Sequence, residues 1–415
     1  MNPESVRVNS KAPQPVNNLA VVLTLAGATA LSNFSSFAFL PSIFAVGIGL
    51  QTSVTSIQST VFVYQWLFAI ATLGAGQMAD RYDKTHVLML GTCLVLLGGA
   101  GAAMATNFSQ FLLWRCVQAV GAAITFVSAR AIAADVVDRS WLVTAMAWIA
   151  GTSSLASMTA PVLGGWIEQM ANWRYTFVLV AVYAFTVAVF IWRLVLPLTR
   201  KAARDPLAPP PPRAPFRWGD VLPSGKVMRC CCAIGMNSFS FHLFMATAPV
   251  LLPRLYGFTP GEVGTAMIAP TLGFVAAMPL SNLVARRSRQ PIHWLMRGAL
   301  GMLAVVGFTL AAFAWFGLPP IMLLATVFFA GFTNAFVVPM GFAAVTMLDE
   351  GKAGSVSGML AFIQFVIGGA AGLLALGLTE LDFTAVGLTV CAGAVLGTLL
   401  VPTFPKGMHL AAKRQ

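Results

Sequence analysis

The sequence predicts an all-α integral membrane protein with about twelve transmembrane helices in two six-helix bundles. Three observations predict this fold class: an extreme composition, a succession of long apolar stretches, and a proline-rich basic segment near the middle of the chain. The 415 residues are 58% hydrophobic and only 9% charged, whereas soluble globular chains average about 25% charged residues. This composition excludes a soluble enzyme, a disordered protein and a nucleic-acid binder with a basic groove.

Each apolar stretch is long enough to cross a bilayer, which takes about 20 mostly apolar residues in a helix. The first stretch is too long for the core of a cleaved signal peptide, and no small-residue cleavage pattern follows it. In chain order, the stretches predict spanning helices near 19–40, 54–78, 87–106, 108–133, 141–165, 175–196, 228–252, 263–285, 291–317, 319–347, 354–378 and 383–404.

The segment 197–226 separates the sixth stretch from the seventh. It is rich in proline, including Pro209 to Pro212, and in basic residues, so it cannot bury a core and is expected to be an extended linker. The domains that we predict are therefore an N-terminal tail at 1–18, a bundle at 19–196, the linker at 197–226, a second bundle at 227–404 and a C-terminal tail at 405–415. The basic pairs Arg81/Lys84 and Arg286/Arg289 recur at the same place in each half, as expected of a six-plus-six repeat.

The distribution of positive charge predicts the orientation in the membrane. Of 25 Lys and Arg residues, only Arg174 and Arg254 fall in loops on the far side, and Arg115 falls inside a span. The positive-inside rule then places both termini in the cytoplasm. We expect a multi-pass protein of the bacterial inner membrane, whose net charge of +12 reflects topology and not a nucleic-acid partner.

The six cysteines lie almost wholly in apolar stretches, so no disulfide framework is expected. The run Cys230 to Cys232 has two interpretations, a metal or redox site and a set of small apolar residues at a helix start; the second fits its setting better. No cluster of His, Asp and Glu shares one membrane depth, and no phosphate-binding glycine-rich loop is present. We expect no metal, no cofactor and no enzymatic chemistry.

The loop after the second stretch carries the first family motif. It reads Gly76-Gln-Met-Ala-Asp80-Arg81-Tyr-Asp83-Lys84-Thr85. This resembles the major facilitator superfamily signature G-x-L-A-D-R-x-G-R-K, with Asp83 in place of a glycine and Thr85 in place of a basic residue. The resemblance implies the major facilitator fold, in which an aspartate at this point can cap a neighbouring helix. It assigns gating roles to Gly76, Asp80, Arg81 and Lys84.

Further motifs resemble the drug/proton antiporter branch, and within it the Bcr/CflA-like exporters that confer bicyclomycin and chloramphenicol resistance. Span four contains Arg115-Cys-Val-Gln118 and ends in an A-R-A-I-x-x-D pattern, and span five ends in Pro161-Val-Leu-Gly164-Gly165. Other matches are Trp173-Arg174, the loop Tyr256–Pro260, and the start of span eleven at Gly354 with Gln364. The resemblance implies gating roles for Arg130, Asp135, Gly151, Pro161, Gly164 and Gly165.

The sequence departs from that branch in the first span. Its exporters usually carry an acid before the Tyr-Leu-Pro that ends helix 1, and Phe37 occupies this place. All 13 acids fall in loops or at helix ends. Arg115 lies about 10 Å inside span four at 1.5 Å per residue, so either it faces a watery cavity or it snorkels. A cavity with Arg115 and no carboxylate would favour neutral or anionic substrates.

Helices 1, 4, 7 and 10 line the cavity in this superfamily. His242, near mid-depth in span seven, and Arg115 are the candidates for proton coupling, because imidazole titrates near neutral pH; the alternative for His242 is a hydrogen bond to a neighbouring helix. The polar and aromatic residues that we expect at the substrate cavity are Asn33, Phe37, Gln65, Arg115, Gln118, Asn237, His242, Asn334 and Gln364.

These observations predict a secondary active transporter that exports small amphipathic molecules, neutral or anionic, by alternating access. Its expected partners are a small-molecule substrate, protons and the lipid bilayer, and we expect a monomer. The alternative is an uptake carrier or facilitative uniporter of the same fold for a small organic anion. The missing acid at Phe37 keeps this alternative open.

Overall fold

The structure is a computed structural model that describes residues 19–137, 139–203, 225–287, 292–348, 353–380 and 382–403. Both predicted tails, 1–18 and 405–415, lie outside the described residues, as does most of the predicted linker. Every regular element within the described residues is helical, which confirms the predicted fold class. Eleven described segments are long and apolar enough to cross a membrane, and the 32-residue α6 occupies the position of the remaining predicted span.

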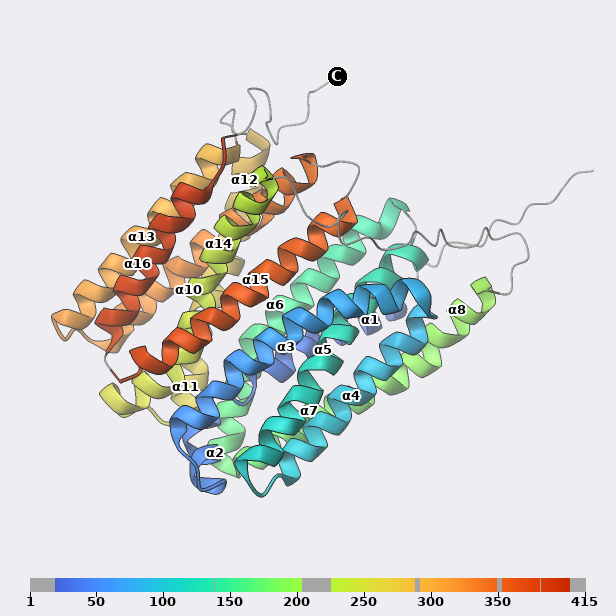
Figure 1. Ribbon diagram of the computed structural model, residues 1–415, viewed down its shortest axis with the longest axis horizontal. Helices are drawn as coiled ribbons and strands as arrows, with labels where there is room; N and C mark the ends of the chain where they lie inside the picture. The colour runs from blue at the N-terminus through green and yellow to red at the C-terminus, as the bar shows by residue number, and fades with distance from the viewer. Residues whose placement is uncertain are drawn as a thin grey trace, which may run out of the picture.

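The helices form two groups in chain order (Figure 1). The N-terminal bundle contains α1 (Leu19–Phe37), η1 (Leu40–Ser42), α2 (Ile43–Gly49), α3 (Val54–Arg81), α4 (Lys84–Met104), α5 (Phe108–Val136), α6 (Arg139–Met170), α7 (Trp173–Phe190), η2 (Ile191–Val195) and α8 (Leu196–Ala203). The C-terminal bundle contains α10 (Gly225–Tyr256), α11 (Pro260–Ala266), α12 (Ala269–Arg287), α13 (Ile292–Trp315), α14 (Pro320–Leu348), α15 (Ala353–Leu378) and α16 (Phe383–Leu400).

The observed helices differ from the predicted spans at three places. The first span breaks after Phe37 and continues as η1 and α2. The sixth span contains a π-helical turn at Ile191–Val195. Residues 197–203, predicted as linker, extend the same helix as α8. Hydropathy alone could not find the break after Phe37 or the π-helical turn, because hydropathy reports polarity and not the hydrogen-bond pattern of the backbone. α8 was predicted as linker because it contains Arg200 and Lys201.

Several helix starts are capped by side chains of the preceding loop, which satisfies amide groups that have no partner within the helix. Asn107 and Asn172 cap α5 and α7. Asp83 caps α4 by accepting hydrogen bonds from the backbone of Thr85 and His86 at 2.9 and 3.0 Å. Partial burial raises the pKa of Asp83, but the hydrogen bonds from His86 and Thr85 outweigh it, so the pKa lies below its usual value.

Helix ends explain the two arginines that departed from the positive-inside pattern. Arg174 donates through Nη1 to the carbonyl oxygens of Ala103 and Ala105, both at 2.7 Å, where α4 ends. Arg254 donates to the carbonyl oxygen of Thr379 at 2.6 Å, where α15 ends. A cation is favourable at a helix carboxyl end, because the last carbonyls have no intrahelical donors. Each arginine therefore caps a helix of its own bundle.

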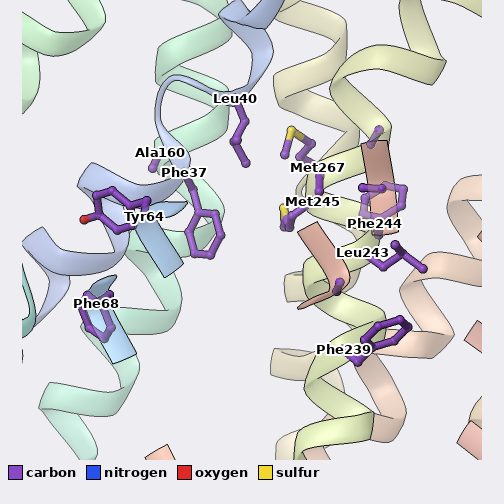
Figure 2. Close-up of a cluster of buried hydrophobic side chains, with 14 of the residues drawn as sticks. Phe37, Leu40, Tyr64, Phe68, Ala160, Phe239, Leu243, Phe244, Met245 and Met267 are labelled. Carbon is purple, nitrogen blue, oxygen red and sulfur yellow. The ribbon is translucent and has the colours of Figure 1, made fainter. Parts of the chain in front are cut away.

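The two bundles meet along α3 and α15, and a single large apolar cluster includes residues of both. Figure 2 shows Phe37 and Leu40 on the N-terminal side of this boundary, with Met245 and Met267 on the C-terminal side. The end of the bundles that carries α2 is called the α2 end below. The opposite end, where α8 finishes and α10 starts, is called the linker end.

Candidate functional site

A cavity of about 240 Å³ lies between the bundles. Five elements besides α1 contribute to its wall, namely α6, α10, α12, α14 and α15, so neither bundle forms it alone. No Asp, Glu, Lys or Arg occurs among the described residues of the wall. Its lining residues are Asn33, Phe37, Ser154, Ser157, Ser238, Phe241, His242, Pro270, Thr271, Phe274, Asn334, Val338, Gln364 and Phe365.

Five of the nine residues predicted at the cavity line it. They are Asn33, Phe37, His242, Asn334 and Gln364. The contributions of α6 and α12 were not predicted, because small hydroxyl residues such as Ser154, Ser157 and Thr271 are also common where helices pack closely. The sequence carries a signal in span five, where Ser154 and Ser157 are three residues apart and so share one face of the helix.

His242 lies in an aromatic part of the cavity. Its ring centroid is 6.5 Å from that of Phe37, 5.4 Å from Phe241 and 6.4 Å from Phe365. Its Nδ1 is 2.9 Å from the carbonyl oxygen of Ser238 on the preceding turn of α10. The predicted alternative of a hydrogen bond to a neighbouring helix is therefore wrong, since the partner is in the same helix.

Amide side chains connect the helices around the cavity. Asn33 donates to the carbonyl oxygen of Ser153 at 3.1 Å, which links α1 to α6. Asn237 donates to Asn334 at 2.6 Å, which links α10 to α14, and Asn237 faces a smaller cavity inside the C-terminal bundle. Gln364 donates to the hydroxyl of Ser238 at 2.6 Å. These bonds hold the cavity wall in one arrangement.

Arg115 lies away from the cavity, contrary to the sequence prediction. Its side chain is 1% exposed, and its guanidinium carbon is 4.3 Å from the ring centroids of both Phe39 and Tyr64. It donates to the carbonyl oxygen of Ser35 at 2.9 Å and to the amide oxygen of Gln118. Stacking on two rings stabilises a buried cation without a carboxylate. The guanidinium thus braces α1, α3 and α5.

The prediction that Gln118 and Gln65 line the cavity is also wrong. Gln118 is fully buried beside Arg115, and Gln65 is 3% exposed within α3; neither lines the cavity. The prediction that helix 4 lines the cavity fails in this conformation, since α5 supplies no lining residue. Spacing showed that Arg115 and Gln118 share a helix face, but it could not show which neighbours that face meets.

At the α2 end, α6 and α11 pack so closely that only glycine fits at the contact. A Cβ atom on Gly165 would lie 2.2 Å from the carbonyl oxygen of Pro260, and one on Gly264 would lie 2.3 Å from that of Pro161. Gly164 instead meets the carbonyl oxygen of Ala38, within its own bundle. The motif residues Pro161 and Gly165 therefore lie where the bundles close against each other.

Gln58 connects the bundles at the same end, although no sequence motif marks this residue. This side chain is 1% exposed. It donates to the carbonyl oxygen of Ala246 on α10 at 3.0 Å and accepts from the hydroxyl of Thr379 at 3.3 Å. At the level of the cavity, Trp66 donates to the carbonyl oxygen of Val366 at 3.1 Å. No other hydrogen bond between described residues joins the bundles.

The motif residues at the linker end make fewer contacts. Lys84 forms an ion pair with Asp135 inside the N-terminal bundle, and the guanidinium carbon of Arg130 lies 3.9 Å from the ring centroid of Phe126. Space around Gly76 and Gly151 is open, with no atom within 4 Å of an added Cβ. Arg81 ends α3 and is exposed; the backbone of Asp80 belongs to α3, and its side chain lies outside the described residues.

Two helical bundles of membrane-spanning length with a cavity between them are the arrangement of secondary transporters that work by alternating access. Comparison with known proteins identifies the family. Residues 25–373 match the Major Facilitator Superfamily, and the chain belongs to this family.

Similar proteins are known by sequence and by structure. The chain is 29% identical over 324 residues to Multidrug resistance protein MdtL of Citrobacter koseri, a match covering 76% of this chain and 78% of that protein. It is 27% identical over 300 residues to the protein of that name from Shigella flexneri, covering 71% and 73%. A D-xylose-proton symporter superimposes with a TM-score of 0.73 at 13% identity, covering 93% and 98% of the chains, which shows the shared fold.

Proposed function

We propose that this transporter exports small uncharged amphipathic molecules from the cytoplasm across a bacterial inner membrane in exchange for protons. The observation that carries the proposal is the central cavity, which both bundles line and which interbundle contacts close at the α2 end. Likeness to proteins named for multidrug resistance supports export of drug-like molecules. One chain supplies both bundles, so a monomer suffices.

The orientation is part of the proposal. The positive-inside rule puts the linker end and both termini in the cytoplasm. Arg174 and Arg254 lie on the opposite side, and their roles as helix caps account for them. With the α2 end closed and facing away from the cytoplasm, this conformation is inward-facing and ready to receive substrate from the cytoplasm. If the bundles then close at the linker end and open at the α2 end, substrate is released outside the cell.

The wall of the cavity supports uncharged substrates over organic anions. Anion preference rested on Arg115 facing the cavity, and the structure buries Arg115 among aromatic rings instead. The described wall has no cation to attract an anion and no carboxylate to attract a cation. Uptake or uniport of an organic anion is accordingly the weaker alternative. His242, the one titratable side chain in the described wall, is the candidate proton carrier.

The test uses the purified full chain in liposomes with a pH gradient that is imposed and then collapsed. Transport is followed for radiolabelled antibacterial compounds that are neutral, cationic and anionic but similar in size. We expect gradient-dependent movement of the neutral compounds, with a proton flux in the opposite direction, and no such movement in empty liposomes. Gradient-independent flux would support a uniporter, and preferential anion flux would support the alternative.

A further inference from the structure

The side-chain amide of Asn33 presents a hydrogen-bond acceptor to the cavity. Its Nδ2 donates to the carbonyl oxygen of Ser153 at 3.1 Å. A carbonyl oxygen can only accept, so this bond fixes which way the amide is turned and directs Oδ1 away from Ser153. No described residue donates a hydrogen bond to that oxygen. Asn33 lines the cavity, and its acceptor is available there.

His242 presents a second acceptor. Its Nδ1 faces the carbonyl oxygen of Ser238 at 2.9 Å, so Nδ1 carries the hydrogen. The neutral imidazole then has a bare lone pair on Nε2, and no described residue donates to it. Rings of Phe37, Phe241 and Phe365 lie around the imidazole. An acceptor in an apolar aromatic setting binds a donor strongly, because water competes poorly there.

Two further amide side chains line the cavity, and their hydrogen bonds define which of their groups remain for a bound molecule. Gln364 uses Nε2 to donate to Ser238, which leaves its amide oxygen as an acceptor. Asn334 uses its oxygen to accept from Asn237, which leaves its NH₂ group as a donor. No charged side chain occurs among the described lining residues. Asn33, His242 and Gln364 therefore each keep an acceptor atom to which no described residue donates.

We propose that Asn33 and His242 bind substrate by accepting its hydrogen bonds, and that the transported compounds are uncharged amphiphiles with N–H or O–H donors on an aromatic body. The inference rests on the proposed transport function and specifies its substrate class. The aromatic body packs against Phe37, Phe241 and Phe365. A carboxylate would direct its lone pairs at the two acceptors and be rejected.

The same lone pair gives the site a response to pH. A proton on Nε2 turns His242 from an acceptor into a cationic donor, so a proton and a donor-bearing substrate compete for one position. The side chains that face His242 from the packed elements are Phe37 of α1, Phe241 of α10 and Phe365 of α15, with Gly368 of α15 against the ring. None of these titrates, so the response belongs to the imidazole. Mutual exclusion of proton and substrate is what an exchanger requires.

The experiment measures equilibrium binding of three matched probes to the purified full chain by calorimetry, without a membrane gradient. The probes are 2-naphthamide, which has two N–H donors, N,N-dimethyl-2-naphthamide, which has none, and 2-naphthoate, which is an anion. We expect the amide to bind about tenfold or more tightly than either of the others, the effect of leaving buried acceptors unpaired. We expect amide affinity to fall as the pH is lowered from 8 to 5.

Variants assign the effect to the two acceptors. His242→Phe keeps a ring but removes the acceptor, and Asn33→Leu removes the amide; each should abolish the preference for the amide over the dimethylamide. His242→Gln retains an acceptor that does not titrate, so it should keep part of the preference and lose the pH dependence. Thr247→Val is the matched control, because this buried hydroxyl on α10 bonds within its own helix and lies outside the cavity.

The inference is overturned if the amide and dimethylamide bind equally, if naphthoate binds most tightly, or if the amide shows no measurable binding. It is also overturned if His242→Phe and Asn33→Leu fold normally and keep the full preference. Binding at equilibrium is independent of transport direction and coupling. A positive binding result with no proton-driven flux in liposomes would therefore reject the proposed function and leave the substrate assignment intact.

Discussion

At the scale of single residues, the structure places Arg115 and His242 in different surroundings, although the sequence predicted both at one site. Arg115 and His242 were both expected in the cavity as groups that carry charge. His242 lines the cavity, whereas Arg115 is enclosed between Phe39 and Tyr64 and connects three helices of one bundle. Both residues lie within helices that were predicted as spans, Arg115 in α5 and His242 in α10. The direction of the Arg115 side chain was not predictable, because it depends on how neighbouring helices are rotated.

This placement predicts that Arg115 acts through the stability of the N-terminal bundle. Arg115→Ala should lower the free energy of unfolding by about 2–4 kcal/mol, since it leaves a cavity and two unpaired acceptors. Arg115→Met keeps the volume and the ring contacts and removes a desolvated charge, so it should recover much of the stability and of the flux. Thermal unfolding and liposome flux are measured on both variants. A stable Arg115→Met protein without flux would contradict this view.

Phe37 occupies the wall position where the resemblance to drug exporters predicted an acid, and it contacts Phe241 and His242. Phe37→Asp should shift selectivity toward lipophilic cations, because the described wall otherwise has no charge to balance them. Phe37→Asn introduces a side chain of the same shape as aspartate but without the charge, so this variant serves as the control. Flux of paired neutral and cationic compounds is compared in liposomes. Equal selectivity of the two variants would mean that the carboxyl is protonated or faces elsewhere.

At the scale of helices, the contact between α6 and α11 needs glycine at two positions. Gly165→Ala puts a methyl group 2.2 Å from the carbonyl oxygen of Pro260, closer than van der Waals contact allows. The two elements must separate, so we expect faster amide hydrogen exchange in α11 and a smaller population closed at the α2 end. Gly151→Ala, on the same helix with open space around it, should leave exchange unchanged. Identical exchange in both variants would show that α11 moves to accommodate the methyl group at no cost.

At the scale of the whole molecule, few polar contacts hold the bundles together at the α2 end. Gln58→Leu removes the hydrogen bonds to Ala246 and Thr379 and leaves each bundle complete. Loss of about 1–2 kcal/mol should shift the equilibrium between conformations by roughly 5- to 30-fold toward opening. Spin-label distances between α2 and α11 report the shift. Thr60→Val on the same helix, whose hydroxyl bonds within α3, should not change them.

Much of this architecture was predictable, because bilayer thickness sets helix length and composition reveals it. All twelve predicted spans coincide with helices, and the break after Phe37 escaped notice because it is as apolar as its surroundings. Motif resemblance identified Pro161 and Gly165 as special, and the structure adds their partners in α11. Interbundle contacts such as that of Gln58 join residues far apart in the chain, which no local pattern encodes.

The uncharged wall of the cavity has a consequence for energy supply. Under the proposed exchange, one proton enters the cell while one neutral molecule leaves, so each cycle moves one net charge inward. A membrane voltage of 100 mV then contributes about 2.3 kcal/mol per cycle in addition to the pH difference. That energy corresponds to a substrate gradient of roughly 50-fold. The protein would thus run on voltage alone when the internal and external pH are equal, which an exchanger of a proton for a monovalent cation cannot do.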